Sequence, residues 1–142
     1  MSEHLRTHAA SPVQDQEQVG TRTFAGKPGE VSQARAFAAE ILGGGCPVSD
    51  DAILCVSEFS ANAVLHSRSG DPGGRFTVRV EMIPRDYVWV EVEDGGGPWG
   101  GRADDGAPGH GLDIVGKIAS EWGVDGYDSG WVVWARFDVP AG

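Results

Sequence analysis

Two alternating segments joined by a short turn constrain the fold of this chain more than any other feature. Residues 76–82, FTVRVEM, and residues 87–93, YVWVEVE, alternate between apolar and more polar side chains, and Pro84-Arg85-Asp86 lies between them. A period of two is the side-chain period of a β-strand. The pair therefore predicts an antiparallel hairpin with one buried face and one face toward solvent.

The segments around this hairpin predict three helices and two more strands. Helices are expected over residues 31–42, which Gly43-Gly44-Gly45 ends, over residues 49–66, where Ser49 is the N-cap and Asp50 and Asp51 occupy the first turn, and over residues 112–122. Strands are expected over residues 21–25 and 131–137. Strands and helices that are segregated in this way indicate an α+β sandwich.

Length and composition fit one domain without a membrane span. The chain has 142 residues, and residues 1–20 are polar and show neither period, so we expect a disordered tail before a single domain over residues 21–140. No apolar run approaches the ~18 residues of a transmembrane helix, and the N-terminus lacks the features of a secretory signal, so we expect a cytoplasmic protein. Cys46 and Cys55 are interpreted as free thiols.

The charge balance limits the class of partner. The net charge is −10 and the chain has only two lysines, Lys27 and Lys117, which argues against direct binding to the phosphate backbone of a nucleic acid. An acidic protein can still bind a nucleotide when a divalent cation lies between the charges. Nucleotide binding therefore stays open, and it would need a cation site.

A narrow polar stripe interrupts the otherwise apolar surface of the helix over residues 49–66. Glu58, Asn62 and His66 are spaced by four residues, so they fall on one face of that helix. A carboxylate and an amide between apolar neighbours are costly unless water, a cation or a ligand satisfies them. The stripe is either a wet seam at the helix edge or part of a binding cleft, and its spacing alone favours the seam.

The glycine-rich stretch over residues 92–112 spells two nucleotide motifs, and its context fits neither. Gly95, Gly97 and Gly100 match G-x-G-x-x-G, but no helix follows them and the preceding strand belongs to a hairpin, whereas a dinucleotide fold needs a βαβ unit. The match to G-x-x-x-x-G-K at Gly111 and Lys117 lies within a helical period. Both motifs are rejected.

Four segments in this order resemble the GHKL ATPase superfamily, and most of all the bacterial anti-sigma factor serine kinases. They are Val56 to His66 with its Glu, Asn and His, Val92 to Pro98 with D-x-G, Gly109-His110-Gly111-Leu112, and Gly130 to Trp134. Each segment alone is weak, but their ordered recurrence is specific. The resemblance implies the Bergerat fold, a two-layer sandwich with a mixed, mostly antiparallel sheet covered on one face by about three helices.

The resemblance also implies a role for each residue of the helical stripe and of the D-x-G segment. Glu58 would be the general base, and Asn62 would ligate Mg²⁺ beside the nucleotide. His66 would line the phosphate end, unless it is a hydrated histidine at the rim. Asp94 would accept a hydrogen bond from the exocyclic amine of adenine, and Gly96 would let the backbone approach the base.

The third and fourth segments would complete the site. Gly109 and Gly111 would shape a loop that brings the phosphates to the N-terminus of the helix that starts at Leu112, and residues 99–108 would form a lid. The chain departs from the family at Trp131 and Val132, which stand where Lys and Thr are usual. The hydroxyl that often supports the adenine-binding aspartate is therefore missing.

The function that the resemblance implies is an ATP-binding anti-sigma factor with serine kinase activity toward an anti-anti-sigma antagonist. ATP and Mg²⁺ would be its cofactors, and a sigma factor and a STAS-type protein its partners, with no membrane contact. The alternatives are a nucleotide-binding module that sequesters its partner without kinase turnover, a protein that binds no nucleotide, and a histidine kinase-type ATP-binding fragment. The last is disfavoured because no phosphoacceptor hairpin precedes Val31. A homodimer stays open.

Overall fold

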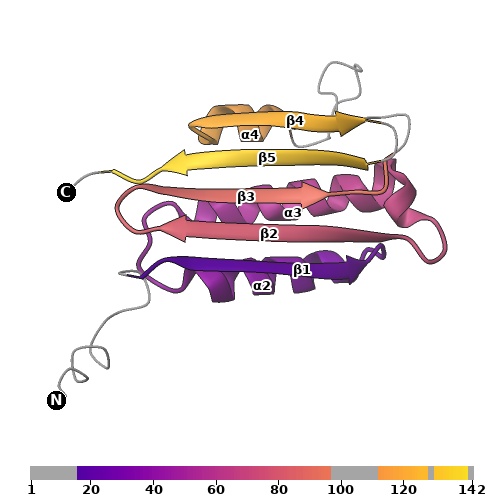
Figure 1. Ribbon diagram of the computed structural model, residues 1–142, viewed down its shortest axis with the longest axis horizontal. Helices are drawn as coiled ribbons and strands as arrows, with labels where there is room; N and C mark the ends of the chain where they lie inside the picture. Colours follow the sequence, from indigo (N-terminus) through magenta and orange to yellow (C-terminus); the bar gives the residue numbers. More distant parts are fainter. Residues whose placement is uncertain (1–15, 97–111, 128–129, 141–142) are drawn as a thin grey trace, which may run out of the picture.

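Three α-helices cover one face of a five-stranded sheet in the computed structural model, which describes residues 16–96, 112–127 and 130–140 (Figure 1). The elements in chain order are β1 (Gln18–Ala25), α2 (Glu30–Leu42), α3 (Ser49–His66), the 3₁₀ helix η2 (Arg68–Gly70), β2 (Arg75–Ile83), β3 (Tyr87–Glu93), α4 (Leu112–Ile118), β4 (Glu121–Tyr127) and β5 (Gly130–Asp138). The strand order is β1-β2-β3-β5-β4, and all four pairings are antiparallel. The predicted α+β sandwich is confirmed.

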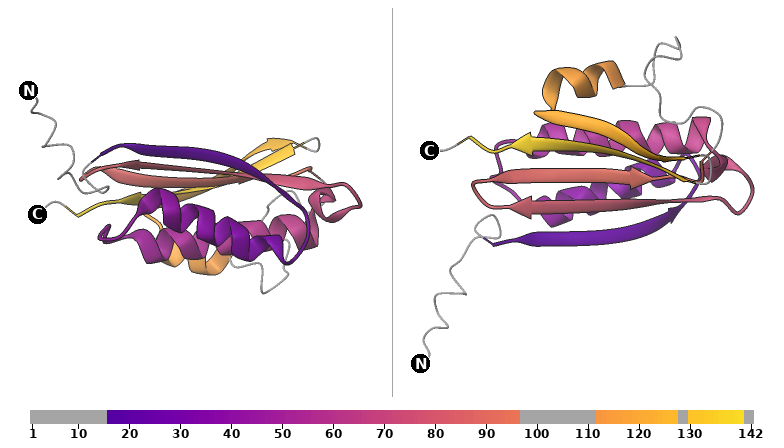
Figure 2. Two further views of the ribbon diagram at one scale, coloured as in Figure 1. Left: turned by 90° about the horizontal axis from the view of Figure 1, so that it is seen from below. Right: turned by 45° about the horizontal axis from the view of Figure 1, so that its top comes forward.

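The helices form one layer. Seen along the edge of the sheet, α2, α3 and α4 all lie on the same side (Figure 2). Helix α2 packs against β1 and β2, α3 packs mainly against β3, and α4 packs against β4 and α3. No helix in the described part of the chain is long and apolar enough to cross a bilayer.

The predicted hairpin lies at the centre of the sheet. Val80 pairs with Val90 and Val78 with Val92, and all four side chains are buried on the face toward the helices. Helix α3 contributes the opposing apolar layer, with Ala52, Cys55, Val56, Phe59 and Ala63 buried. The alternation in the sequence therefore selects which face of the sheet the helices cover.

Three phenylalanines close the core at the β1 edge. The Phe24 ring stacks on the Phe76 ring with centroids 5.5 Å apart, and it meets the Phe37 ring edge-on at 6.0 Å. Phe24 and Phe76 are neighbours in the β1–β2 register, and Phe37 comes from α2. This cluster attaches α2 and the edge strand to the central hairpin.

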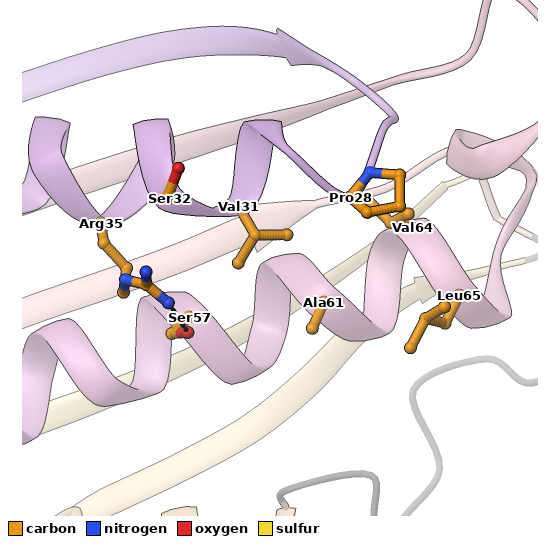
Figure 3. A pocket seen from close by; sticks show the side chains of 8 residues that line it. All are labelled: Pro28, Val31, Ser32, Arg35, Ser57, Ala61, Val64 and Leu65. Atoms are coloured by element: carbon orange, nitrogen blue, oxygen red, sulfur yellow. Dashed lines mark hydrogen bonds between the residues drawn. The ribbon is translucent and has the colours of Figure 1, made fainter.

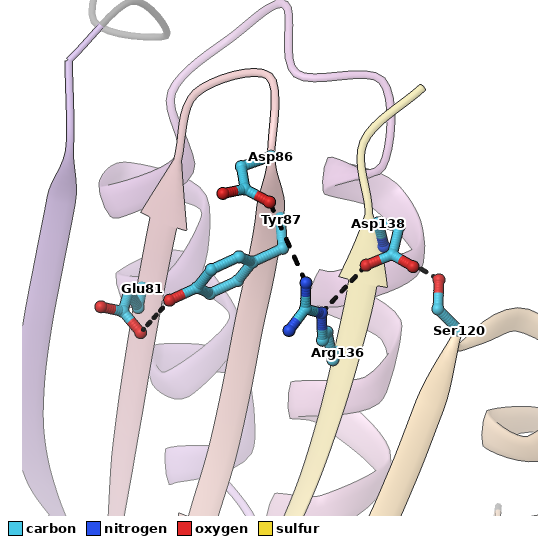
Figure 4. A network of polar contacts seen from close by, with 6 residues as sticks. All are labelled: Glu81, Asp86, Tyr87, Ser120, Arg136 and Asp138. Atoms are coloured by element: carbon cyan, nitrogen blue, oxygen red, sulfur yellow. Dashed lines mark hydrogen bonds and ion pairs between the residues drawn. The ribbon is translucent and has the colours of Figure 1, made fainter. Parts of the chain in front are cut away.

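The other face of the sheet carries polar and aromatic side chains. Tyr87 donates a hydrogen bond to Glu81 at 3.2 Å, and the Arg136 guanidinium lies 4.5 Å from the centroid of the Tyr87 ring. Arg136 also forms ion pairs with Asp138 at 2.9 Å and Asp86 at 3.9 Å (Figure 4). The hydrogen bond to Asp138 raises the pKa of Arg136. These contacts link β2, β3 and β5 on the solvent side.

Two tryptophans from neighbouring strands stack on this solvent face. The rings of Trp89 and Trp134 are 4.7 Å apart and nearly parallel, at 8°. Trp89 Nε1 donates to Glu91 at 2.8 Å, so its polar edge is satisfied. The wet face expected from the sequence is thus partly aromatic.

The strand β4 was not expected from the sequence, and the predicted helix over residues 112–122 is too long. Helix α4 ends at Ile118, and Trp122, which fits the helical period, lies in β4 opposite Ala135 of β5. Gly123 and Gly126 lower the strand propensity of this segment, whereas pairing along β5 satisfies its backbone. Tertiary pairing therefore overrides the local helical pattern.

The start of β1 and the N-cap of α3 also differ from the sequence prediction. Strand β1 begins at Gln18, so residues 18–20 belong to the sheet and not to the tail; the rest of the expected tail, to residue 15, lies outside the described residues. The expected N-cap Ser49 is the first residue of α3, and its buried Oγ has no hydrogen-bond partner among the described residues. Asp50 and Asp51 do occupy the first turn.

Removal of the Phe76 ring should destabilise the fold strongly. Phe76 is 1% exposed. We expect Phe76→Ala to lower the free energy of unfolding in urea by about 3–5 kcal/mol, because it leaves a cavity among the aromatic rings. The control Val19→Ala changes a side chain that is 53% exposed, so it should stay within about 0.5 kcal/mol of the parent. Equal effects of the two variants would contradict this account of the core.

The burial of Cys55 affects both the pH dependence of stability and the reactivity of its thiol. Burial, followed by the Asp51 and Glu58 carboxylates, raises the pKa of its thiol from 9.0 to about 12. The unfolded thiol ionises first, so the unfolded state binds fewer protons and this residue's contribution to stability falls as pH rises from about 9 to about 12.

The burial of Cys55 can be tested by chemical modification. In a Cys46→Ala variant, a thiol-specific disulfide reagent should leave Cys55 unmodified at pH 8 until urea unfolds the protein. Rapid modification in the folded state would contradict the burial.

Candidate functional site

Helix α3 presents the predicted polar stripe on successive turns. Asn62 is buried, at 4% exposure, although it is an amide on an apolar helix, and Glu58 and His66 are half-buried. The neighbouring buried residues Cys55 and Phe59 place this part of α3 against the sheet. The stripe is therefore not an ordinary solvated face, and Asn62 lies deeper than a wet seam at the helix edge would put it.

A groove runs along another flank of α3, between this helix and α2. It has a volume of about 380 Å³, and Figure 3 shows the side chains that line it. Arg35 of α2 donates a hydrogen bond to Ser57 of α3 across it at 3.2 Å. Its lining residues on α3 are Ser57, Ala61, Val64 and Leu65. None of the stripe residues lines this groove.

Asp94 follows the last residue of β3 and is 6% exposed. Its Oδ1 accepts backbone hydrogen bonds from Gly96 at 2.7 Å and from Trp131 at 3.3 Å, and its own N–H donates to the Trp131 carbonyl at 2.9 Å. Two main-chain N–H groups thus orient a buried carboxylate. A carboxylate held in this way is a fixed acceptor rather than a mobile surface charge.

Gly96 forms the bend beyond Asp94. Its φ of 80° is a conformation that residues with side chains rarely adopt, and the residue is buried. The Gly96 carbonyl accepts a hydrogen bond from the Arg68 N–H at 2.9 Å. The loop over residues 94–96 is therefore attached on one side to β5 and on the other to η2.

The departures at Trp131 and Val132 do not remove the support of Asp94. Trp131 provides its backbone N–H and carbonyl, which any residue would supply. Val132 pairs with Glu93, next to the buried pair of Val133 with Val92. Because side chains alternate along a strand, Val132 lies on the face away from the helices.

The third predicted segment is described only at its end. Leu112 is the first residue of α4 and is 3% exposed, and Val115 on the next turn is fully buried. Both side chains anchor α4 in the core beside α3. Gly109, Gly111 and the proposed lid over residues 99–108 lie outside the described residues.

The C-terminal end of α3 and the Asp94 loop meet at one end of the sandwich. Helix α3 ends there, and η2 joins it to β2 where β3 ends and β5 begins (Figure 1). Hydrogen bonds continue across this end: Ser67 Oγ donates to the Ala63 carbonyl at 2.7 Å, and Gly95 N–H donates to Ser69 Oγ at 2.8 Å. Residues that are far apart in the sequence are thus brought to one location.

The sequence did not identify the residues that join α3 to the Asp94 loop. The sequence alone assigns no role to the segment from Ser69 to Gly74, yet Ser69 is fully buried and bonds to the Asp94 loop. Two hydroxyl residues around Arg68 before a glycine are a weak signal for a hydrogen-bonded turn. Among the described residues, no group of three or more His, Cys, Asp or Glu side chains could hold a metal ion.

Comparisons with known proteins agree with this geometry. The family model for the histidine kinase-like ATPase domain matches residues 24–137. The crystal structure of the RsbU and RsbW domains of Rv1364c from Mycobacterium tuberculosis is similar in fold, with a TM-score of 0.66 and 20% sequence identity over 87% of this chain. The match covers 33% of that longer chain, and no curated protein matches. Since the family model spans most of its residues, the chain belongs to the histidine kinase-like ATPase domain family.

Proposed function

We propose that this protein binds ATP with Mg²⁺ and transfers the γ-phosphoryl group to a serine of an antagonist protein, as an anti-sigma factor kinase. The observation that carries the proposal is that Glu58 and the buried Asn62 lie one turn apart on α3, and that hydrogen bonds join the C-terminal end of this helix to the Asp94 loop through η2. Membership of the ATPase family supports nucleotide binding. Kinase activity goes beyond nucleotide binding, and it is proposed from Glu58 as the general base.

Asp94 would recognise the base. Its buried carboxylate is already oriented by the Gly96 and Trp131 N–H groups, so it could accept a hydrogen bond from the exocyclic amine of adenine with little reorganisation. The amine would take the place of the water molecule that otherwise hydrates a carboxylate. Gly96 has no side chain, so the base could approach the backbone at this bend. These features fit adenine as the base.

Asn62 and Glu58 would act at the phosphate end. Mg²⁺, when bound with the nucleotide, neutralises phosphate charge, and the Asn62 carbonyl oxygen is a hard ligand suited to it. Glu58 would accept the proton of the serine hydroxyl as the serine oxygen forms a bond to the γ-phosphorus and the bond to the β–γ bridging oxygen breaks. ADP then leaves with that electron pair. His66, Gly109, Gly111 and the N-terminus of α4 at Leu112 would contact the phosphates.

The proposed partners follow from the similarity to an RsbW domain. They are a sigma factor, which the protein would hold when unopposed, and a STAS-type anti-anti-sigma protein that carries the acceptor serine. The net charge of −10 supports a protein partner over direct contact with nucleic acid. A cytoplasmic location and a homodimer remain part of this proposal. The domain would cover residues 21–140 together with residues 18–20, which belong to β1.

Loss of the Asp94 charge should remove base recognition. We expect Asp94→Asn to weaken Mg-ATP binding at least about tenfold, since the amide places a donor where the exocyclic amine needs an acceptor. Isothermal titration calorimetry at equal protein concentration measures this change. The control Asp125→Asn makes the same change at an exposed position of β4 and should bind like the parent. The absence of binding heat with the parent would overturn the nucleotide assignment altogether.

Glu58→Gln should separate binding from turnover. The amide keeps the size of the side chain but cannot take a proton, so we expect phosphoryl transfer to fall by about 10²–10⁴-fold while the Kd for Mg-ATP stays within about threefold. Transfer of labelled γ-phosphate to the antagonist protein measures the rate. Glu40→Gln, an exposed change on α2, is the control. A parent that binds ATP without transfer would favour the alternative, a module that sequesters its partner without turnover.

A further inference from the structure

A buried hydroxyl outside the predicted site contacts the Asp94 loop directly. Ser69, in η2, is fully buried, and its Oγ accepts a hydrogen bond from the Gly95 N–H at 2.8 Å. Gly95 lies between Asp94, which precedes it, and Gly96, whose N–H bonds the Asp94 carboxylate. The Ser69 hydroxyl thus holds the peptide bond between Asp94 and Gly95.

On its other side, Ser69 is attached to the last turn of α3. The Ser69 N–H donates to Ser67 Oγ at 3.0 Å, and Ser67 Oγ donates to the Ala63 carbonyl at 2.7 Å. The neighbouring Arg68 N–H donates to the Gly96 carbonyl at 2.9 Å. A continuous hydrogen-bonded path therefore leads from the residue after Asn62 to the loop that carries Asp94.

The main chain of Ser69 has no room to shift. A Cβ atom at Gly26 would lie 1.6 Å from the Ser69 carbonyl oxygen, and one at Gly74 would lie 2.2 Å from it. Gly26 N–H also donates to the Gly74 carbonyl at 2.9 Å, which joins the end of β1 to the start of β2 around this turn. Glycines at these two positions permit a close contact that fixes η2 against the sheet.

From these contacts we propose that Ser69 is a positioning residue for base recognition, acting through Gly95 on the Asp94 carboxylate. The inference rests on the proposed function, because it assigns Ser69 to the adenine end of that site. Its hydroxyl sets the position of the Asp94 loop relative to α3, so the acceptor for the base and the Asn62 carbonyl keep a constant separation. Without the hydroxyl, the Gly95 N–H is left without its partner and the loop relaxes.

This role predicts an effect that depends on the base. A hydrogen bond to the exocyclic amine of adenine is directional, so it is sensitive to a small displacement of Asp94. Purine riboside triphosphate has hydrogen in place of that amine and keeps the same ring, ribose and triphosphate. Its binding does not use the Asp94 acceptor, so displacement of the loop leaves it nearly unchanged.

The experiment compares the Kd values of both nucleotides, each with Mg²⁺, by calorimetry in the parent and in Ser69→Ala. We expect the Kd for ATP to rise about tenfold in the variant and the Kd for purine riboside triphosphate to rise less than about threefold. The ratio of the two Kd values, which measures the preference for the base that carries the amine, therefore falls. A purely structural role would weaken both nucleotides equally or neither.

Ser60→Ala is the matched control. Ser60 on α3 is also fully buried, but its hydroxyl has no hydrogen-bond partner among the described residues. Its removal should leave both Kd values unchanged. Ser67→Ala provides a second route, since it breaks the same path at a half-buried position, and it decides the question if the circular dichroism spectrum shows that Ser69→Ala is unfolded.

The outcomes separate the two proposals. If the parent binds ATP and the base preference is unchanged in the folded Ser69→Ala, or in Ser67→Ala where the former does not fold, the positioning role is overturned and the proposed function stands. If the parent binds neither nucleotide, both proposals are overturned. A lost preference with Ser60→Ala unaffected supports the role of Ser69.

Discussion

The burial of one face of the central hairpin against α3 determines where the rest of the structure lies. Val78, Val80, Val90 and Val92 form this face and are almost fully buried. Because side chains alternate along a strand, a shift of one residue in register would turn the whole set to solvent. The same alternation places Asp94, two residues beyond Val92, on the helix side of the sheet. The register that makes the core thus also directs the carboxylate toward the layer that contains α3.

Main-chain groups and hydroxyls hold the described part of the site together. Asp94 accepts N–H bonds from Gly96 and Trp131, and its loop is bonded to the turn that carries Ser69. Neutral donors orient a buried carboxylate without cancelling its charge, so it remains a strong acceptor for a ligand. These bonds explain how an acidic chain can hold a carboxylate in its interior. They also explain why Asp94 keeps its main-chain support although Trp131 and Val132 differ from the residues usual at those positions.

Sequence reasoning succeeded where a local period coincides with burial, and it failed where pairing decides. The hairpin and the full extent of α3 agree with the structure because their apolar residues repeat at the strand and helix periods. The segment around Trp122 fits a helix locally but pairs with β5 as β4. The Ser49 N-cap was wrong because α3 begins one residue earlier than a side-chain cap there would require. The importance of Ser69 was invisible because its partner, Gly95, is distant in sequence.

The sequence by itself determined the α+β class, the central hairpin, the polar stripe on α3 and the resemblance to an ATPase family, since each rests on spacing within a short segment. Only the tertiary structure decided that Asn62 is buried, that Val132 pairs with Glu93 on the face of the sheet away from the helices, and that η2 joins α3 to the Asp94 loop. The physical reason is that burial and hydrogen-bond partners depend on which segments pack together. The spacing of residues specifies which face of a helix or strand they share, whereas the tertiary structure determines which other segment packs against that face.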